Sequence, residues 1–242
     1  TYNVTGKQTL VGSSANTFTY TLTEGTKADN YTITKVEGTL TVTDGTGEGE
    51  DPIPDEKVVT KSTGDEETNS EKYHVGDTVE WTIWVKNIYD EEKSLTVTEI
   101  EGMQIVAPTE LPKTLKAGAE LTITVQHVVT VADINSENGK IYNKVTVKLG
   151  DLEKTGEDDV ETEKIKITIT ADSASKTYDS TPLTKNSYKL TSGTLAEGDK
   201  IDSVTVTGSQ TLVGESANVP SAAKIVNAAG EDVTGGSEVP DA

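Results

Sequence analysis

The sequence contains no cysteine and no arginine, and each absence excludes a class of protein. Without cysteine, disulfide frameworks and thiolate metal sites are excluded, so packed cores or another kind of crosslink must stabilise the chain. All 21 basic residues are lysine, against 41 acidic residues, and the net charge is −20. Nucleic acids and anionic lipid surfaces repel such a chain, so we expect neither nucleic-acid binding nor membrane insertion.

Histidine is also scarce, since His74 and His127 are the only two, and a His-rich metal site is therefore excluded. The sequence has no Gly-x-Ser-x-Gly elbow, no His-Glu-x-x-His pair and no phosphate-binding glycine loop. Acidic pairs such as Asp158-Asp159 are expected by chance in a chain with 41 acids. We therefore predict that the protein is not an enzyme and needs no cofactor.

Threonine, in contrast, makes up about one residue in six, and threonine, valine and isoleucine favour strands. Between residues 78 and 86, apolar Val79, Trp81, Ile83 and Val85 alternate with polar residues, which is the period of a half-buried strand. Several such strands follow, separated by glycine and proline turns, and residues 131–138 are the only helix candidate. The pattern predicts an all-β fold of Ig-like β-sandwich modules in tandem, in an elongated arrangement.

A repeat of thirteen residues divides the rest of the chain. Residues 4–16 recur as residues 206–218 with eleven of thirteen positions identical, which indicates an array of similar modules. The first copy continues into predicted strands, which span residues 18–23, 31–36 and 38–43. The second copy instead follows upstream strands from residue 164 onward. Both copies are cut in mid-pattern, so we expect the chain to be a segment of a longer polypeptide.

The predicted domain organisation has five parts. They are the back half of an adhesin-type repeat (1–44), an acidic linker (45–56), a central sandwich (57–150), a second acidic linker (151–163) and the front part of a second repeat (164–242). The linkers are rich in carboxylates and poor in apolar residues, as solvated connectors are. Their spacing does not match an EF-hand, and a structural calcium ion at the linkers stays an open alternative.

The central module resembles a family of Ig-like repeats of unknown function from bacterial surface proteins. The resemblance rests on Lys61, Gly76–Asn87 (GDTVEWTIWVKN), TVTEIE from Thr96, KAGAELTITVQHVVTV from Lys116 and IYNKVTV from Ile141. Glu99 stands where the family usually has aspartate. The flanking parts resemble the short repeats of bacterial adhesins, through Tyr178-Asp179, Pro182-Leu183 and Gly38–Thr43. The usual glycine after Tyr-Asp is replaced by Ser180.

The resemblance implies a secreted, cell-wall-attached surface protein of a Gram-positive bacterium. It also suggests a covalent feature, because related proteins often join a first-strand lysine to a last-strand asparagine with the help of a buried acid. Lys61, Asn143 and Glu99 share the inward phase of their strands and are the candidates for such an isopeptide bond. In the alternative interpretation, Lys61 extends outward, Glu99 caps a loop and Asn143 stabilises a turn.

Two functions remain open at this stage. The first is a structural stalk or spacer of a cell-surface adhesin, held between neighbouring repeats of the same polypeptide. The second is a module that binds a host glycan or extracellular-matrix protein. Trp84, on the outward phase of its strand, is the candidate ligand contact together with Tyr89, because an exposed tryptophan stacks well on sugars. Packing of Trp84 against a loop is the alternative.

The cut repeats suggest one further partner. Residues 30–43 carry the final strands that the second repeat lacks. Because unpaired strand edges invite strand addition, this segment of one chain is expected to complete the repeat ending at residue 242 of another chain. Such strand exchange between chains would be a consequence of truncation.

Overall fold

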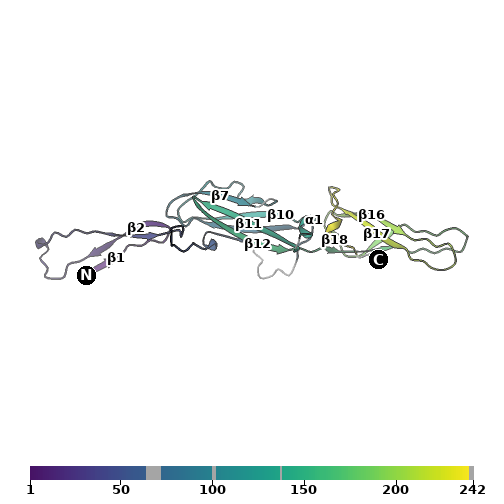
Figure 1. Ribbon diagram of the computed structural model, residues 1–242, viewed down its shortest axis with the longest axis horizontal. Helices are drawn as coiled ribbons and strands as arrows, with labels where there is room; N and C mark the ends of the chain where they lie inside the picture. The colour runs from purple at the N-terminus through teal and green to yellow at the C-terminus, as the bar shows by residue number, and fades with distance from the viewer. Residues whose placement is uncertain (64–71, 100–101, 137, 240–242) are drawn as a thin grey trace. The chain divides into compact units, whose positions relative to one another are not determined.

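The computed structural model describes residues 1–63, 72–99, 102–136 and 138–239 (Figure 1). The prediction of an all-β fold is confirmed, because the regular structure in these ranges consists mainly of short strands. Its one α-helix in the described ranges, α1 (Val131–Ile134), lies where the sequence offered its helix candidate. Thr130 and Asp133 cap this helix with reciprocal hydrogen bonds. No helix in the described ranges is long and apolar enough to cross a membrane.

Two four-stranded sheets form the central sandwich. In sheet order, the first contains β5 (Val59–Ser62), β6 (Thr78–Lys86), β10 (Glu120–Val128) and β8 (Gln104–Ala107). The second contains β12 (Leu152–Glu161), β11 (Lys140–Leu149), β7 (Lys93–Glu99) and β9 (Thr114–Leu115). Figure 1 shows β7, β11 and β12 running beside one another. Inward-facing side chains of both sheets make one apolar core, which includes Ile83, Val85, Ile123, Val125, Val145, Val147 and Leu149.

Contacts divide the chain into two compact units that differ from the predicted domains. The first comprises residues 1–64, 81–125 and 143–158, and the second comprises residues 65–80, 126–142 and 159–242. The sandwich core lies in the first unit. The second unit has its own buried apolar residues, among them Val79, Val129, Ile134, Ile141, Ile167, Ile169 and Ile225. The division therefore runs through the predicted central module, and one of its boundaries, between residues 158 and 159, falls inside the predicted second linker.

The prediction that residues 151–163 form a linker is wrong, because β12 occupies most of that range as an edge strand of the sandwich. Leu152, Gly156 and Val160 are buried, and Thr162 beyond the strand is buried as well. The acidic residues that suggested a linker lie mainly between these inward positions and face solvent. A strand needs only one apolar face, so a high carboxylate content did not prevent strand formation.

The N-terminal segment contains two separate strand pairs. β1 (Tyr2–Val4) pairs with β3 (Phe18–Tyr20), and β2 (Gly12–Asn16) pairs with β4 (Gly38–Val42). Short 3₁₀ turns, η1 (Ala28–Asn30) and η2 (Asp55–Lys57), complete the segment. The predicted strand at residues 31–36 is wrong: this stretch has no strand partner, and its apolar side chains are exposed. Period-2 alternation alone does not make a strand when no neighbouring strand is available.

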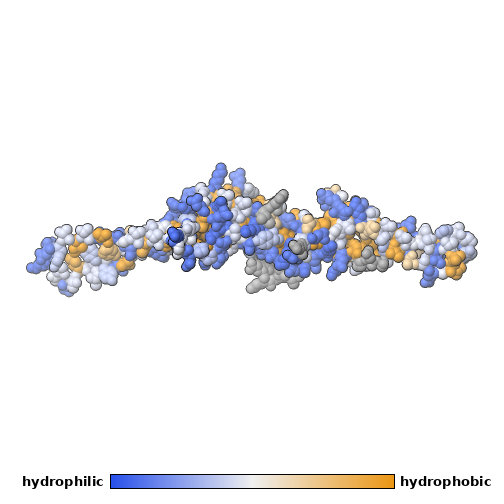
Figure 2. Space-filling model, viewed as in Figure 1, coloured by the Kyte–Doolittle hydropathy of each residue, from blue (hydrophilic) through white to orange (hydrophobic). Residues whose placement is uncertain are grey.

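The C-terminal segment contains three strand pairs and the turn η3 (Thr234–Gly236). β13 (Ile165–Lys166) runs parallel to β18 (Ser237–Glu238), while β14 (Thr168–Ala171) pairs antiparallel with β15 (Tyr188–Ser192). The longest pair joins β16 (Lys200–Thr207) to β17 (Val219–Val226). Figure 2 shows hydrophilic residues over much of the visible central part and apolar residues at several places on the C-terminal segment.

Candidate functional site: a buried lysine, glutamate and asparagine

The three residues predicted to form a crosslink are all withdrawn from solvent. Lys61 is 6% exposed and Asn143 is fully buried, while the side chain of Glu99 is 6% exposed. Each lies on a strand of the sandwich: Lys61 on β5, Glu99 at the end of β7 and Asn143 on β11. The alternation of each strand therefore turns all three side chains inward, and the alternative with Lys61 extending to solvent is wrong.

Lys61 and Glu99 form an ion pair between the two sheets. The Lys61 Nζ lies 2.8 Å from Glu99 Oε1 and 2.7 Å from Oε2, and the lysine side chain is fully buried. Two charges taken out of water lose hydration that their attraction only partly restores, so such a pair adds little stability by itself. The buried Lys61–Glu99 pair is therefore better explained by a chemical role than by a contribution to folding stability.

The Asn143 side chain lies close by and makes no hydrogen bond. Val145 pairs directly with Glu99 across β11 and β7, and Asn143 is two residues from Val145 on the same face of β11. Diagonal neighbours in a sheet lie about 7–8 Å apart, which is within the reach of long side chains. In the part of the chain that the structure describes, neither the Nδ2 nor the Oδ1 of Asn143 has a hydrogen-bond partner, although both are buried. An unpartnered buried polar group costs about 1–3 kcal/mol, so the orphaned amide points to a functional role.

The edge strand β12 closes the site from a third side. A Cβ atom added to Gly156 would lie 3.4 Å from the Cβ and backbone N of Lys61, so the missing side chain lets β12 approach β5 closely. Asp158 follows on the same face of β12, and its charge acts on Lys61. Neither residue was predicted, because both fall in the range taken for a linker. The spacing of Leu152, Gly156 and Val160 was the signal that could have revealed them.

Burial moves the two titratable groups toward their neutral forms. Desolvation lowers the pKa of Lys61, although the contact with Glu99 and the charge of Asp158 act in the opposite direction. Desolvation likewise raises the pKa of Glu99 against the effect of Lys61. Both shifts reduce the free energy needed to pass a proton from the lysine to the glutamate. The site can therefore supply a neutral amine and a protonated carboxylic acid beside an amide.

The aromatic residues predicted as ligand contacts are both engaged in the structure. Trp84 is half-buried on the outer face of β6, where its Nε1 donates to Glu120 Oε2 at 3.1 Å and Lys86 lies over its ring. Tyr89 is only 8% exposed, and its hydroxyl donates to Asp44 Oδ2 at 2.8 Å. The expectation that Tyr89 offers its ring to a ligand is therefore corrected, because the linker that follows β4 covers it.

Among residues 1–63, 72–99, 102–136 and 138–239, no group of three histidine or acidic residues is placed to hold a metal ion. In and directly before the first predicted linker, two carboxylates have protein partners. Asp44 accepts hydrogen bonds from Thr46 and Tyr89, and Asp55 accepts from the backbone and hydroxyl of Thr155. Comparison with known proteins finds no family model that matches the chain and no curated protein that matches it significantly.

Proposed function

We propose that the chain is a non-catalytic stalk segment of a bacterial cell-surface protein, and that an isopeptide bond between Lys61 and Asn143 closes its central sandwich. The observation that carries the proposal is the orphaned amide of Asn143 within the same core as a buried lysine–glutamate pair. Formation of the bond would remove both unfavourable features, because it consumes the buried charge of the lysine and the primary amide of the asparagine.

The reaction needs no group beyond these three side chains. A proton passes from Lys61 Nζ to Glu99, which leaves a neutral amine and a carboxylic acid. The amine attacks Cγ of Asn143 while the acid donates a hydrogen bond to Oδ1 and so polarises the carbonyl. The new C–N bond forms, the old C–Nδ2 bond breaks, and Glu99 relays a proton to the departing nitrogen. The products are a secondary amide and one molecule of ammonia.

Such a bond suits a stalk that lacks cysteine. It would tie β5 of one sheet to β11 of the other, so that the sandwich could not open between residues 61 and 143. The tandem repeat, the strand-rich modules and the resemblance to cell-wall adhesins favour a module that carries load outside the cell. The proposal accordingly places the protein on the surface of a Gram-positive cell, where it would project an adhesive part away from the wall.

Intact mass of the denatured chain tests the bond directly. We expect the full chain to be lighter than its sequence mass by one ammonia, and the variants Lys61→Ala and Asn143→Ala to show no such deficit. Digestion should yield one branched peptide that contains residues 61 and 143.

A separate source of the same mass change must be controlled, because Asn138-Gly139 can lose ammonia by cyclising to a succinimide. That loss would persist in Lys61→Ala, whereas the isopeptide loss would not. A chain at full sequence mass, or a Lys61→Ala variant with the same deficit as the wild type, would overturn the proposed bond.

A further inference from the structure

The two copies of the thirteen-residue repeat fold in the same way. Pairing of β1 with β3 aligns Val4 with Phe18, and pairing of β16 with β17 aligns the equivalent Val206 with Pro220. Equivalent side chains also make equivalent hydrogen bonds: Gln8 Nε2 to Leu10 O, Gln210 Nε2 to Leu212 O, Ser14 Oγ to Lys7 O and Ser216 Oγ to Ser209 O. Differences between the copies beyond this shared turn therefore reflect what each copy contacts.

The first copy is docked on the sandwich. The backbone N–H of Val11 donates to Ile88 O at 2.8 Å, and the N–H of Asp90 donates to Val11 O at 2.9 Å. The neighbouring Leu10 side chain packs close to Gly118. Leu10 and Val11 are half-buried as a result. The apolar tip of the repeat thus binds the turn that follows β6.

A strand and a linker complete this docking. β2 pairs over its whole length with β4, from Gly12 opposite Val42 to Asn16 opposite Gly38. The chain then reaches Asp44, whose carboxylate accepts the hydroxyl of Tyr89 in the same sandwich turn. One continuous stretch, residues 38–163, therefore supplies both the strand and the sandwich that cover the first copy.

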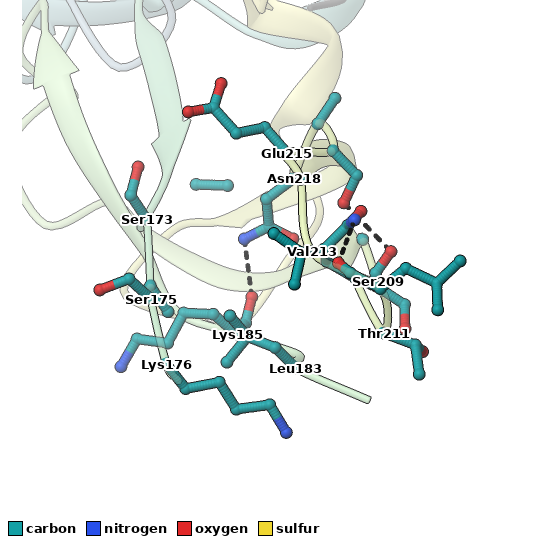
Figure 3. A pocket seen from close by; sticks show the side chains of 18 of the residues that line it. Ser173, Ser175, Lys176, Leu183, Lys185, Ser209, Thr211, Val213, Glu215 and Asn218 are labelled. Atoms are coloured by element: carbon teal, nitrogen blue, oxygen red, sulfur yellow. Dashed lines mark hydrogen bonds between the residues drawn. The ribbon is translucent and has the colours of Figure 1, made fainter. Parts of the chain in front are cut away.

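Within the described residues, the second copy has neither of these partners. Leu212 is 72% exposed and Val213 is 88% exposed, although their equivalents in the first copy are half-buried. Residues 214–218 form no strand, although the equivalent residues form β2. Val213, Glu215 and Asn218 line a cavity of about 770 Å³. Figure 3 shows Ser173 and Ser175 facing it from a neighbouring segment, while Asn218 Nδ2 donates to Lys185 O at 2.8 Å. Space and apolar surface are thus available where the first copy has a partner.

The backbone conformation of Gly214 indicates that the second copy can make the contact that Gly12 makes in the first copy. Gly12 has a φ of +145°, and a Cβ added there would collide with the Asp90 carboxylate at 2.0 Å. Gly214 keeps the same conformation, with a φ of +147°, yet the nearest atom to an added Cβ is Gln210 Nε2 at 3.4 Å. A backbone form that only glycine adopts freely is thus maintained at a site that has no neighbour to require it.

We propose that residues 210–218 are the docking site for a further module of the same kind as residues 38–163. A strand like β4 would pair with residues 214–218, and a sandwich turn like Ile88–Asp90 would cover Leu212 and Val213. Glu215 replaces the Ser13 whose hydroxyl contacts Thr41, so the incoming strand is expected to carry a hydroxyl or a lysine opposite it. The β4 strand of a second copy is already paired with its own β2, which disfavours that occupant. This inference goes beyond the crosslink and does not depend on it.

The test extends the full chain at its C-terminus with a second copy of residues 37–163, so that the added sandwich includes its edge strand β12. Peptides covering residues 206–218 are distinguished from residues 4–16 by Ser209 and Glu215, so hydrogen exchange can be followed in each copy separately. In the extended chain, we expect exchange at residues 212–218 to slow to the rate at residues 10–16. In the 242-residue chain, it should stay fast. Doubling of the near-UV circular dichroism from buried Trp81 shows that the added sandwich is folded.

Matched variants identify the contact. Val213→Asp should restore fast exchange in the extended chain, as Val11→Asp should in the first copy. Thr211→Asp is the control, because its equivalent Thr9 is exposed in the docked copy. Fast exchange at residues 212–218 beside a folded added sandwich would overturn the proposal. So would protection of these residues in the unextended chain together with a dimer by light scattering, since the occupant would then be a second copy. Neither result bears on the mass deficit that tests the crosslink.

Discussion

At the scale of single residues, the proposed reaction depends on where one proton lies. The reactive state has a neutral Lys61 and a protonated Glu99, and it contains the same number of protons as the ion pair. The fraction of chains in this reactive state therefore does not change with pH, as long as Lys61 and Glu99 share the one proton that either of them can carry. Below the pKa of Glu99, the pair gains a second proton and Lys61 cannot attack. Above the pKa of Lys61, the pair has lost both protons and no acid is left to polarise the amide.

The rate of crosslinking should accordingly be level around neutral pH and fall on both sides. Because desolvation raises the pKa of Glu99 and lowers the pKa of Lys61, the plateau should be narrower than the ordinary pKa values of 4.5 and 10.5 would give. The measurement starts from chain recovered unfolded and uncrosslinked, dilutes it into buffers across the pH range and follows the loss of ammonia by intact mass.

Glu99→Gln is the control for this profile, since it keeps the size of the side chain and removes the acid. We expect its rate to be low at every pH. A wild-type rate that rises steadily with pH would show that simple deprotonation of the lysine controls the reaction, and it would contradict a role for Glu99.

At the scale of secondary-structure elements, alternation of apolar and polar residues predicted some strands of the sandwich correctly and missed β12. Alternation placed Lys61, Glu99 and Asn143 on inward faces, because each lies in a strand whose neighbours are plainly apolar. The same rule failed for β12, because Gly156 and Asp158 interrupt its inward face and leave only Leu152 and Val160 as widely spaced apolar positions. Pairing with β11, which the sequence does not show, decides that this stretch is a strand. The opposite error at residues 31–36 has the same origin, because alternation was present and the partner strand was absent.

Gly156→Val tests the contribution of β12 to the site. The added Cβ atom would lie 3.3 Å from Val59 Cγ2 and 3.4 Å from Lys61 Cβ. Because valine is branched at this atom, rotation of the side chain is restricted and does not relieve the contact. Overpacking of this kind costs about 1–3 kcal/mol. We expect a lower thermal midpoint and slower crosslinking, because β12 and β5 must move apart and Lys61 moves with them.

Glu153→Val is the matched control on the same strand, because the Glu153 side chain faces solvent. In the described residues its one ion pair is with Lys148, which is also exposed. Such surface pairs contribute about 0–1 kcal/mol, so both stability and crosslinking should stay close to wild type. Equal behaviour of the two variants would mean that close approach of β12 does not position the lysine.

At the scale of the whole molecule, the proposed bond changes the path that force takes through the chain. Tension applied to residues 1 and 242 enters the sandwich along β5 and would pass through the isopeptide bond into β11. The 82 residue steps between positions 61 and 143 would then carry no load and could not extend. Removing Asn143 leaves Lys61 paired with Glu99, so the variant keeps its fold while it loses the bond.

Single-molecule stretching of the wild type and Asn143→Ala therefore shows whether the crosslink bears the applied force, through the length that each chain releases on unfolding. A fully extended chain spans about 3.3–3.6 Å per residue, so the variant should release roughly 270–300 Å more length than the wild type when both are completely unfolded. Residues 1–60 and 144–242 are the same in both chains and contribute equally, which makes the difference specific to the segment between residues 61 and 143. Equal extension would contradict a stalk held by this bond, because residues 62–142 would then unfold under tension in the wild type as well.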